Sequence, residues 1–340
     1  MQMRQVVVTG PYQVELQDAN MDEGSLEPSE VLVQTESTFI SAGTELANYT
    51  GLDPRVRIPG SWGCFPWKAG YANVGVVKAA GQSVDKRLLG KRIFTLGPHA
   101  SAQVHNVNRF VTVEVPEKMS SKEVAASRMA AVSITAVQAA ALKVNGWVAV
   151  FGLGMVGNLA AQMFRLMGCR VIGVDHWASR RKMATGCGIS YVIGGTPEEV
   201  NRLIGEITGG RMVDIAVDAV GNARVAIECI KACANFGEVI LLGTPRGDIE
   251  GNLTPLFNEL HARFVTVKSG SEWRIPAQPQ TGCSQSILGN YHGILDMMQR
   301  QVLQIAPLIT HTIKPEQIKQ AYEGLMHLKD EYIGVAIDWR

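Results

Sequence analysis

The stretch Trp147-Val-Ala-Val-Phe-Gly-Leu-Gly-Met-Val-Gly157 decides the fold of this 340-residue chain. Its first five residues are apolar and predict a short buried parallel strand, while the amphipathic residues 158–167 predict a helix. The Gly-x-Gly-x-x-Gly turn between them permits a tight bend and lets the backbone approach a pyrophosphate at the helix N-terminus. The sequence therefore predicts a dinucleotide-binding turn, made by Gly152, Leu153, Gly154, Met155, Val156 and Gly157.

A carboxylate follows the next apolar run. The run at residues 170–174 is followed directly by Asp175, about 20 residues after the glycine turn. A carboxylate there accepts hydrogen bonds from ribose hydroxyls and repels a 2′-phosphate, so we expect NAD as the cofactor rather than NADP. Arg180 and Arg181 follow closely. Their side chains either bind a phosphate of the cofactor or form a solvated basic turn at the start of the next helix.

From about Ser121, strands and helices alternate as a doubly wound parallel sheet requires. The pattern Ser120-Ser-Lys-Glu123 predicts the start of the first helix. Six strands are predicted, the number of a complete dinucleotide fold, at residues 147–151, 170–174, 191–193, 213–219, 238–242 and 263–268. Ligands of such sheets bind at the carboxyl ends of the strands. The further cofactor candidates at those ends are Val220, Gly221, Leu242, Gly243, Thr244, Ser269 and Gly270.

Residues 1–122 carry short, alternating strand signals separated by Gly, Pro, Asn and Asp. This pattern predicts a small, strongly bent sheet or partial barrel, with strands near residues 6–8, 14–16, 31–33, 74–77, 92–95 and 110–115. The Pro- and Gly-rich stretch 53–70 has no period and predicts a long loop. We expect residues 123–270 to form the dinucleotide domain and residues 271–340 to return to the first domain and complete it.

The composition excludes several classes of protein. A formal net charge of +1 gives no basic field for nucleic acid, and no stretch approaches the ~20 apolar residues of a membrane span. Residues 1–8 lack the cationic and apolar regions of a signal peptide. The six cysteines contain no CxxC pair and indicate neither a zinc knuckle nor a disulfide framework. We expect a cytoplasmic protein that binds a small molecule and has no nucleic-acid or membrane partner.

The order of a β-rich domain, a dinucleotide fold and a C-terminal return resembles the medium-chain dehydrogenase/reductase superfamily over essentially the whole chain. The motifs that carry this resemblance are Gly43-Thr44-Glu45, Gly70-Tyr-Ala-Asn-Val-Gly75-Val-Val77, Gly90-Lys-Arg-Ile93, the glycine turn with Asp175, and Asp218-Ala-Val-Gly221. The resemblance implies a Rossmann domain beside a GroES-like catalytic domain, with hydride transfer to or from a nicotinamide in the cleft between them. It also implies a homodimer formed through the edge strand at residues 263–268.

The chain departs from the zinc-dependent members of that superfamily at the positions of their metal ligands. These positions correspond to Ala42, to Tyr71 with Ala72, and approximately to Ala131. Alanine cannot ligate zinc, and a lone tyrosine is a poor ligand. The four-cysteine structural zinc lobe is absent too. The resemblance therefore implies a zinc-free member, in which hydrogen bonds stabilise the developing alkoxide.

Four side chains are candidates for proton transfer. Thr44 corresponds to the hydroxyl residue that relays the substrate proton in zinc members, or else it bonds within its own turn. Tyr71 stands in place of a zinc-ligating histidine, where its phenol is suited to donate a proton to a carbonyl oxygen or to line the pocket. Glu45 and His99 are further candidates. His99 follows Gly97-Pro98 and is either solvated on a surface turn or a proton carrier near the cleft.

Three functions remain open. The first is a zinc-independent, NAD-dependent oxidoreductase acting on a secondary alcohol or ketone. Polar loop residues favour a sugar or polyol as its substrate, namely Asn73, Glu272, Arg274, Asn290 and His292, while Trp62, Trp67 and Trp273 either wall the pocket or fill the core. The second is a zinc-free quinone or enoyl reductase, whose usual preference for NADPH is opposed by Asp175. The third is a dinucleotide-binding protein without catalysis.

Overall fold

The computed structural model describes residues 1–340 except 23, 25, 110, 247 and 284. The chain divides into two compact units. Unit 1 comprises Met1–Arg128, Ile275–Gln299 and Ile309–Arg340, and unit 2 comprises Met129–Arg274 and Arg300–Leu308. In the part of the chain described, no helix has both the length and the apolar character needed to cross a membrane.

Unit 2 is built on a six-stranded sheet whose strands are all parallel. The order across the sheet is β11 (Tyr191–Ile193), β10 (Arg170–Val174), β9 (Trp147–Phe151), β12 (Val213–Asp218), β13 (Cys233–Leu241) and β14 (Thr266–Ser269). Counted along the chain, this is the 3-2-1-4-5-6 order of the doubly wound dinucleotide fold. The predicted Rossmann fold is therefore confirmed.

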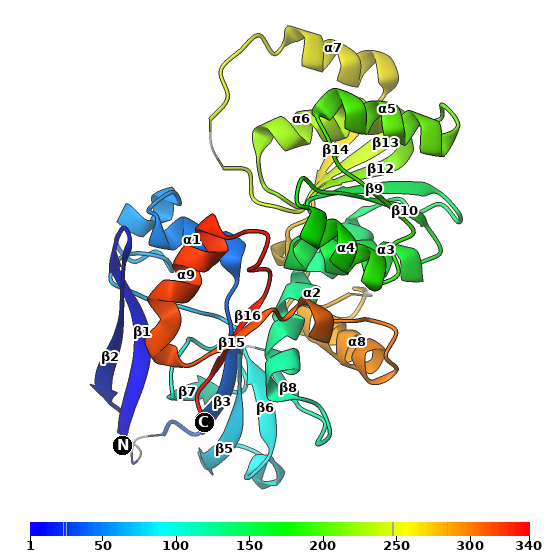
Figure 1. The fold of residues 1–340 in the computed structure, drawn as a ribbon. Helices are drawn as coiled ribbons and strands as arrows, with labels where there is room; N and C mark the ends of the chain where they lie inside the picture. The colour runs from blue at the N-terminus through cyan, green and yellow to red at the C-terminus, as the bar shows by residue number, and fades with distance from the viewer. Residues whose placement is uncertain (23, 25, 110, 247, 284) are drawn as a thin grey trace. The chain divides into compact units, whose positions relative to one another are not determined.

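Helices cover both faces of this sheet (Figure 1). On one face lie α3 (Met155–Leu166) and α4 (Ala178–Gly186). The other face carries α5 (Pro197–Thr208), α6 (Ala223–Ala232) and α7 (Thr254–Arg263). Because the centre of the sheet is buried on both faces, every residue of the central strands β9 and β12 is buried.

Three strands of this sheet have bounds that differ from the prediction. The strand expected at 213–219 ends one residue earlier, at Asp218. The strand expected at 263–268 begins only at Thr266, because α7 continues to Arg263 and Phe264 then ends it with a left-handed φ of 55°. The strand expected at 238–242 begins earlier, at Cys233. Its pairing with β12 shifts register between Val213 and Ile215.

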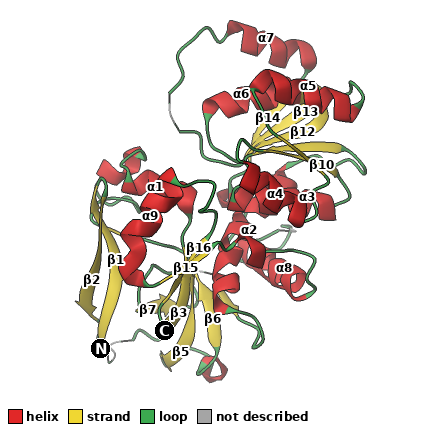
Figure 2. Cartoon of the chain, viewed as in Figure 1, coloured by secondary structure: helices red, strands yellow, loops and turns green. Residues whose placement is uncertain are grey.

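Unit 1 contains the predicted bent β-structure, drawn as yellow strands in Figure 2. A seven-stranded sheet has the order β15 (His311–Ile313), β16 (Val335–Asp338), β3 (Glu30–Phe39), β5 (Asn73–Ala80), β6 (Arg92–Thr95) and β8 (Thr112–Glu114), and β7 (Ala102–Asn106) also pairs with β3. A smaller sheet joins β2 (Gln13–Asn20), β1 (Gln2–Gly10) and β4 (Trp67–Lys68). The prediction missed β4 and β7, and Phe110 of the strand expected at 110–115 lies outside the described residues.

Three helices complete unit 1, which are α1 (Ala42–Tyr49), α8 (Ile287–Gln299) and α9 (Ile318–His327). A fourth helix, α2 (Ser121–Ala139), starts in unit 1 and continues into unit 2. Helix α9 packs its buried Tyr322 and Leu325 into a core that also holds Tyr49 and Trp67. The first domain was expected to end at residue 122, whereas unit 1 extends to Arg128 within α2.

The C-terminal segment returns to unit 1 through β16, which runs antiparallel to β3 and pairs Ala336 with Phe39. We expected all of residues 271–340 to return to the first domain, but two segments of this range belong to unit 2. They are residues 271–274 and Arg300–Leu308. The second exception has a specific cause. Gln162 of α3 donates to the carbonyl of Gln304 at 3.0 Å and accepts from its amide at 2.8 Å.

Candidate functional site

The glycine turn of unit 2 has the backbone that its sequence predicts. Gly152 has a φ of +90° and donates to the carbonyl of Val174 at 2.8 Å. Gly154 is the extended N-cap residue of α3. A Cβ on Gly157 would lie 1.7 Å from the Gly152 carbonyl oxygen, so the helix fits against the turn only without a side chain there. The first amides of α3, at Met155 and Val156, therefore lie within the second half of the turn, and a helix N-terminus of this kind suits a pyrophosphate.

Asp175 links the end of β10 to this turn. Its Oδ2 accepts from the Leu153 amide at 2.7 Å, and its Oδ1 accepts from the Trp177 amide at 2.8 Å. A carboxylate has about four lone-pair positions, so these two bonds leave acceptor capacity for ribose hydroxyls. The structure thus places Asp175 beside the residues that would hold the adjoining pyrophosphate.

The two arginines after Asp175 lie in different environments. The Arg180 Nη1 lies 4.0 Å from Oδ2 of Asp175, and a Cβ on Gly154 would be 3.5 Å from that same Nη1. Arg180 therefore lies against the glycine turn. Arg181 instead donates to the carbonyls of Asp175 and His176, both at 2.8 Å, and so stabilises the backbone of the loop.

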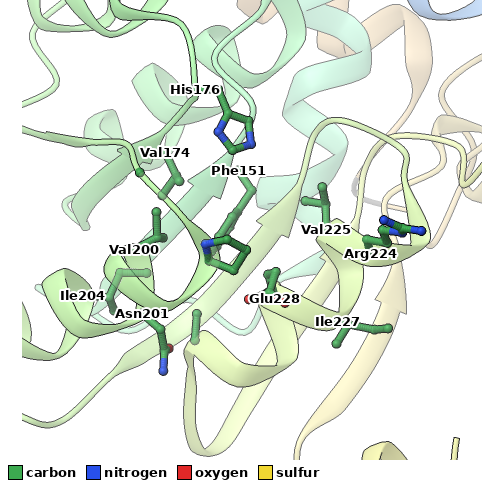
Figure 3. A pocket seen from close by; sticks show the side chains of 13 residues that line it. Phe151, Val174, His176, Val200, Asn201, Ile204, Arg224, Val225, Ile227 and Glu228 are labelled. Carbon is green, nitrogen blue, oxygen red and sulfur yellow. The ribbon is translucent and has the colours of Figure 1, made fainter. Parts of the chain in front are cut away.

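An apolar cavity of about 330 Å³ lies in unit 2 next to Asp175 (Figure 3). Val174 and Phe151 line it from the ends of β10 and β9, Val200 from α5, and Val225 from α6. His176, which follows Asp175 directly, also lines it. The shape and apolar lining of such a slot suit a flat heteroaromatic base. Sequence analysis missed this cavity because its walls come from four separate segments.

The loops after β12 and β13 pack closely at the same edge of the sheet. Asp218 ends β12, and its Oδ1 accepts from the amides of Val220 and Gly221 at 2.9 Å each. Burial raises the pKa of Asp218, and its backbone hydrogen bonds oppose that shift. A Cβ on Gly243 would lie 2.3 Å from the Gly221 nitrogen, so this contact requires glycine.

The remaining cofactor candidates lie on these loops or on the adjoining one. Leu242 donates its amide to the Asp218 carbonyl at 3.0 Å, and Gly270 donates to the carbonyl of Leu241 at 2.9 Å. Ser269 ends β14, and Thr244 contacts Gly221 through its backbone. All the cofactor candidates of the sequence therefore gather at the carboxyl edge of one sheet.

In unit 1, three hydroxyl groups form what we call the hydroxyl cluster, made of Ser41, Thr44 and Tyr71. The Tyr71 phenol donates to Oγ1 of Thr44 at 3.2 Å, and it also makes a short hydrogen bond with Oγ of Ser41. Ser41 is the N-cap residue of α1, yet its side chain caps no amide. The Thr44 hydroxyl therefore accepts a hydrogen bond from Tyr71, outside its own turn.

A second group of side chains in unit 1 consists of Glu45, His99 and Tyr322, and we call it the acid cluster. Glu45 is fully buried and accepts from three donors: the Ser41 amide at 2.7 Å, Tyr322 at 2.8 Å and Nε2 of His99 at 3.0 Å. Since the His99 side chain is 0% exposed, the expectation of a solvated surface turn is wrong. A Cβ on Gly70 would lie 2.6 Å from the imidazole, so a glycine at this position makes room for the ring.

The electrostatics of Tyr71 favour its neutral form. Burial raises the pKa of Tyr71, while the charge of Arg128 and the hydrogen bonds with Ser41 and Thr44 oppose that shift. Burial and the neighbouring carboxylate of Glu45 raise the pKa of Tyr322 well above its usual value. A neutral phenol is a proton donor, so the environment of Tyr71 suits general acid chemistry.

Aromatic side chains adjoin the hydroxyl cluster. Trp62 is 54% exposed and meets the Tyr71 ring edge-on at 5.5 Å between centroids. Trp67 is buried in the core of unit 1, and Trp273 is exposed on unit 2. Asn73, expected among substrate-facing polar residues, is instead buried and donates to Thr35 and to the Pro98 carbonyl at 3.0 Å each.

The residues at the positions that correspond to zinc ligands do not fit the metal. Ala42, Ala72 and Ala131 have no donor atom, and the Tyr71 phenol bonds to the other two hydroxyls of its cluster. Two ligand-type side chains of unit 1, Glu45 and His99, are hydrogen-bonded to one another. Among the described residues, no three His, Cys, Asp or Glu side chains come together as a metal-binding group.

Comparison with known proteins identifies relatives of this chain. A family model described as zinc-binding dehydrogenase matches residues 155–277. The D-guloside 3-dehydrogenase of Shigella flexneri is 23% identical, covering 94% of this chain and 95% of its own. A quinone oxidoreductase of Salmonella typhimurium is 25% identical over 71% of this chain and 73% of its own.

The fold also matches solved structures. An Escherichia coli oxidoreductase/dehydrogenase of unknown specificity, described as involved in membrane biogenesis, superimposes with a TM-score of 0.82. It is 19% identical, and the match covers 99% of both chains. Together with the sheet order and the glycine turn, these findings define an oxidoreductase of the alcohol dehydrogenase-like kind. These findings support the resemblance of the chain to the medium-chain dehydrogenase/reductase superfamily.

Proposed function

We propose that this protein is a zinc-independent, NAD-dependent oxidoreductase that interconverts a secondary alcohol and a ketone. The observation that carries the proposal is the hydrogen-bonded hydroxyl cluster of Ser41, Thr44 and Tyr71. By the resemblance, Tyr71 stands at the position of a zinc ligand and Thr44 at that of the proton-relay hydroxyl. Hydrogen-bond donors at that place can stabilise an alkoxide without a Lewis acid.

NAD, when bound, supplies the nicotinamide carbon that exchanges hydride with the substrate. The residues that would hold it are those of the glycine turn, Asp175 at the ribose, Arg180 beside the turn, and the apolar cavity at the base. The carboxylate of Asp175 supports NAD over NADP because it would repel a 2′-phosphate.

The chain's own chemistry is proton transfer. In the reducing direction, Tyr71 donates its proton to the carbonyl oxygen, and Thr44 and Ser41 hold the phenol in place. In the oxidising direction, the same phenol oxygen must accept the proton. Glu45 and His99 are fully buried and hydrogen-bonded to one another, and Glu45 also accepts from the Ser41 amide at the start of α1. We therefore assign both residues a positioning role.

A sugar or polyol is the substrate class that we propose. The D-guloside 3-dehydrogenase relative supports it, because that protein is named for a sugar derivative. Reduction of an activated C=C bond is the second candidate, and the relative named as a quinone oxidoreductase favours it.

The test is absorbance of the reduced nicotinamide during incubation with secondary alcohols, polyols and sugars. NAD and NADP are compared, and a metal chelator is present throughout. We expect turnover with NAD that the chelator does not reduce. Turnover of quinones or enones alone would establish the second candidate, loss of activity with the chelator would contradict zinc independence, and cofactor binding without turnover of any substrate would indicate a non-catalytic protein.

We also propose that the protein is a homodimer joined through β14. This strand forms one edge of the sheet, and its Val267 and the preceding Phe264 are exposed. An exposed apolar edge strand is otherwise a site of aggregation. The wild type should have a dimeric mass in light scattering, and Val267→Arg should have a monomeric one. Val144→Arg, at a residue that is 94% exposed elsewhere, should leave the mass unchanged, and a monomeric wild type would refute the dimer.

A further inference from the structure

The ring of Tyr71 lies next to a buried cation. The guanidinium carbon of Arg128, on α2, is 4.9 Å from the centroid of the Tyr71 ring. Arg128 is only 3% exposed, although arginine is rarely buried to this extent. A guanidinium at this distance attracts the electrons of the ring, and burial prevents salt and water from screening the attraction.

Two charged groups of opposite sign act on the Tyr71 phenol. Arg128 acts from α2, and Glu45 acts from α1, where it is hydrogen-bonded to the Ser41 amide. The Arg128 charge lowers the pKa of Tyr71, whereas the Glu45 charge raises it. Because an arginine stays protonated at every physiological pH, its contribution is permanent.

We propose that Arg128 is a positioning residue that stabilises the negative charge left on the Tyr71 oxygen when its proton passes to the substrate. The inference rests on the proposed function, because it takes Tyr71 as the proton donor. It assigns a role to a residue outside the motifs that indicated the site.

In the reducing direction, a proton and a hydride add to the carbonyl group of the substrate. The O–H bond of Tyr71 breaks, and its proton joins the carbonyl oxygen. NADH, when bound, would supply the hydride that the carbonyl carbon receives. The electron pair of the broken bond stays on the phenol oxygen, where the hydroxyls of Ser41 and Thr44 can donate to it. A proton from solvent then restores the phenol.

The experiment measures the titration of Tyr71 directly, by NMR of protein labelled with ¹³C at Cζ of tyrosine. Tyr71→Phe identifies the signal. In Arg128→Gln, we expect the midpoint of the Tyr71 titration to rise by about one pH unit or more. We expect kcat to fall about tenfold or more while the KM for the cofactor stays unchanged. Arg128→Lys keeps the charge and should restore part of both properties.

Arg92→Gln is the matched control. Arg92 is also partly buried near the start of α2, where it donates to the carbonyls of Met119 and Pro116 at 2.9 Å each. Loss of the Arg92 guanidinium should lower the free energy of unfolding without moving the midpoint of the Tyr71 titration. If Arg92→Gln moves that titration as far as Arg128→Gln does, the effect is structural and the inference is overturned.

A second measurement does not depend on folding of the Arg128 variants. In the wild type, Tyr71 should titrate at lower pH than Tyr322, which is also buried but donates to Glu45. The reverse order would overturn the inference. An unmoved Tyr71 titration in an active Arg128→Gln enzyme overturns the inference alone. A moved titration in a protein that turns over no substrate overturns the proposed function, and of the inference it leaves only the electrostatic coupling between Arg128 and Tyr71.

Discussion

Nε2 of His99 lies 3.0 Å from Oε2 of Glu45, and both side chains are fully buried. Removing the imidazole leaves a buried carboxylate with one donor fewer, which is costly because water cannot replace it. We expect His99→Asn to lower the free energy of unfolding by about 2–4 kcal/mol in urea titrations.

The chain offers a matched control for this variant. His327 also faces a glutamate, Glu323, at 3.4 Å, but the two side chains are 68% and 42% exposed. His327→Asn should change the free energy of unfolding by less than about 0.5 kcal/mol. Equal effects of the two variants would show that the burial of Glu45 has no energetic consequence.

Gly157→Ala should disrupt the glycine turn. The added Cβ would lie 1.7 Å from the Gly152 carbonyl oxygen, so α3 must move away from the turn. We expect a loss of about 3 kcal/mol in stability and at least a tenfold weaker affinity for NADH, measured by calorimetry. Gly186→Ala, at the end of α4 with no atom within 4 Å of the new Cβ, should be neutral or slightly stabilising. Normal NADH affinity of the Gly157→Ala protein would show that the glycine turn is not required for cofactor binding.

Asp175→Ala should weaken NADH binding more than NADPH binding. The substitution removes the acceptor for ribose hydroxyls and the charge that repels a 2′-phosphate, and a hydrogen bond to a charged group contributes about 1.5–3 kcal/mol. We expect about a tenfold or greater rise in Kd for NADH in fluorescence titrations, while NADPH affinity changes less. The exposed Asp85, replaced by alanine, serves as the control. A wild type that prefers NADPH would refute the role given to Asp175.

His105 should make stability depend on pH. Burial lowers its pKa to about 4, against 6.5 in an unfolded chain. Between these values the unfolded chain binds a proton that the folded protein does not, so stability falls as pH drops from about 6.5 to 4. The full loss is about 3 kcal/mol. His105→Gln should remove this component from the pH profile of urea unfolding, and an unchanged profile would assign it to other groups.

The sequence predicts best what depends on neighbouring residues. The glycines of the turn, Asp175 and the strand-helix alternation of unit 2 are local patterns, because a positive φ or a buried parallel strand is encoded within a few residues. The bounds of β14 were missed because α7 runs on to Arg263 and only the backbone at Phe264 ends it.

The unpredicted parts of the site depend on distant contacts. Tyr322 donates to Glu45 across 277 positions of the chain, and His99 bonds to the same carboxylate across 54. A histidine after Gly97-Pro98 has the local sequence of a surface turn, and only tertiary packing buries it. Arg128 has no motif of its own, since its position over Tyr71 depends on how α2 packs.

The pairing of β16 with β3 has a consequence for the order in which the protein is made. Strand β3 is synthesised long before its neighbour β16, which spans Val335–Asp338. Until β16 is made, the segment Ser37–Phe39 of β3 lacks its partner strand on that edge, although β7 can already pair with Glu30–Gln34. Unit 2, whose sheet strands all lie between Trp147 and Ser269, can meanwhile assemble on the nascent chain. The half of the protein that is synthesised first is therefore the half that is completed last.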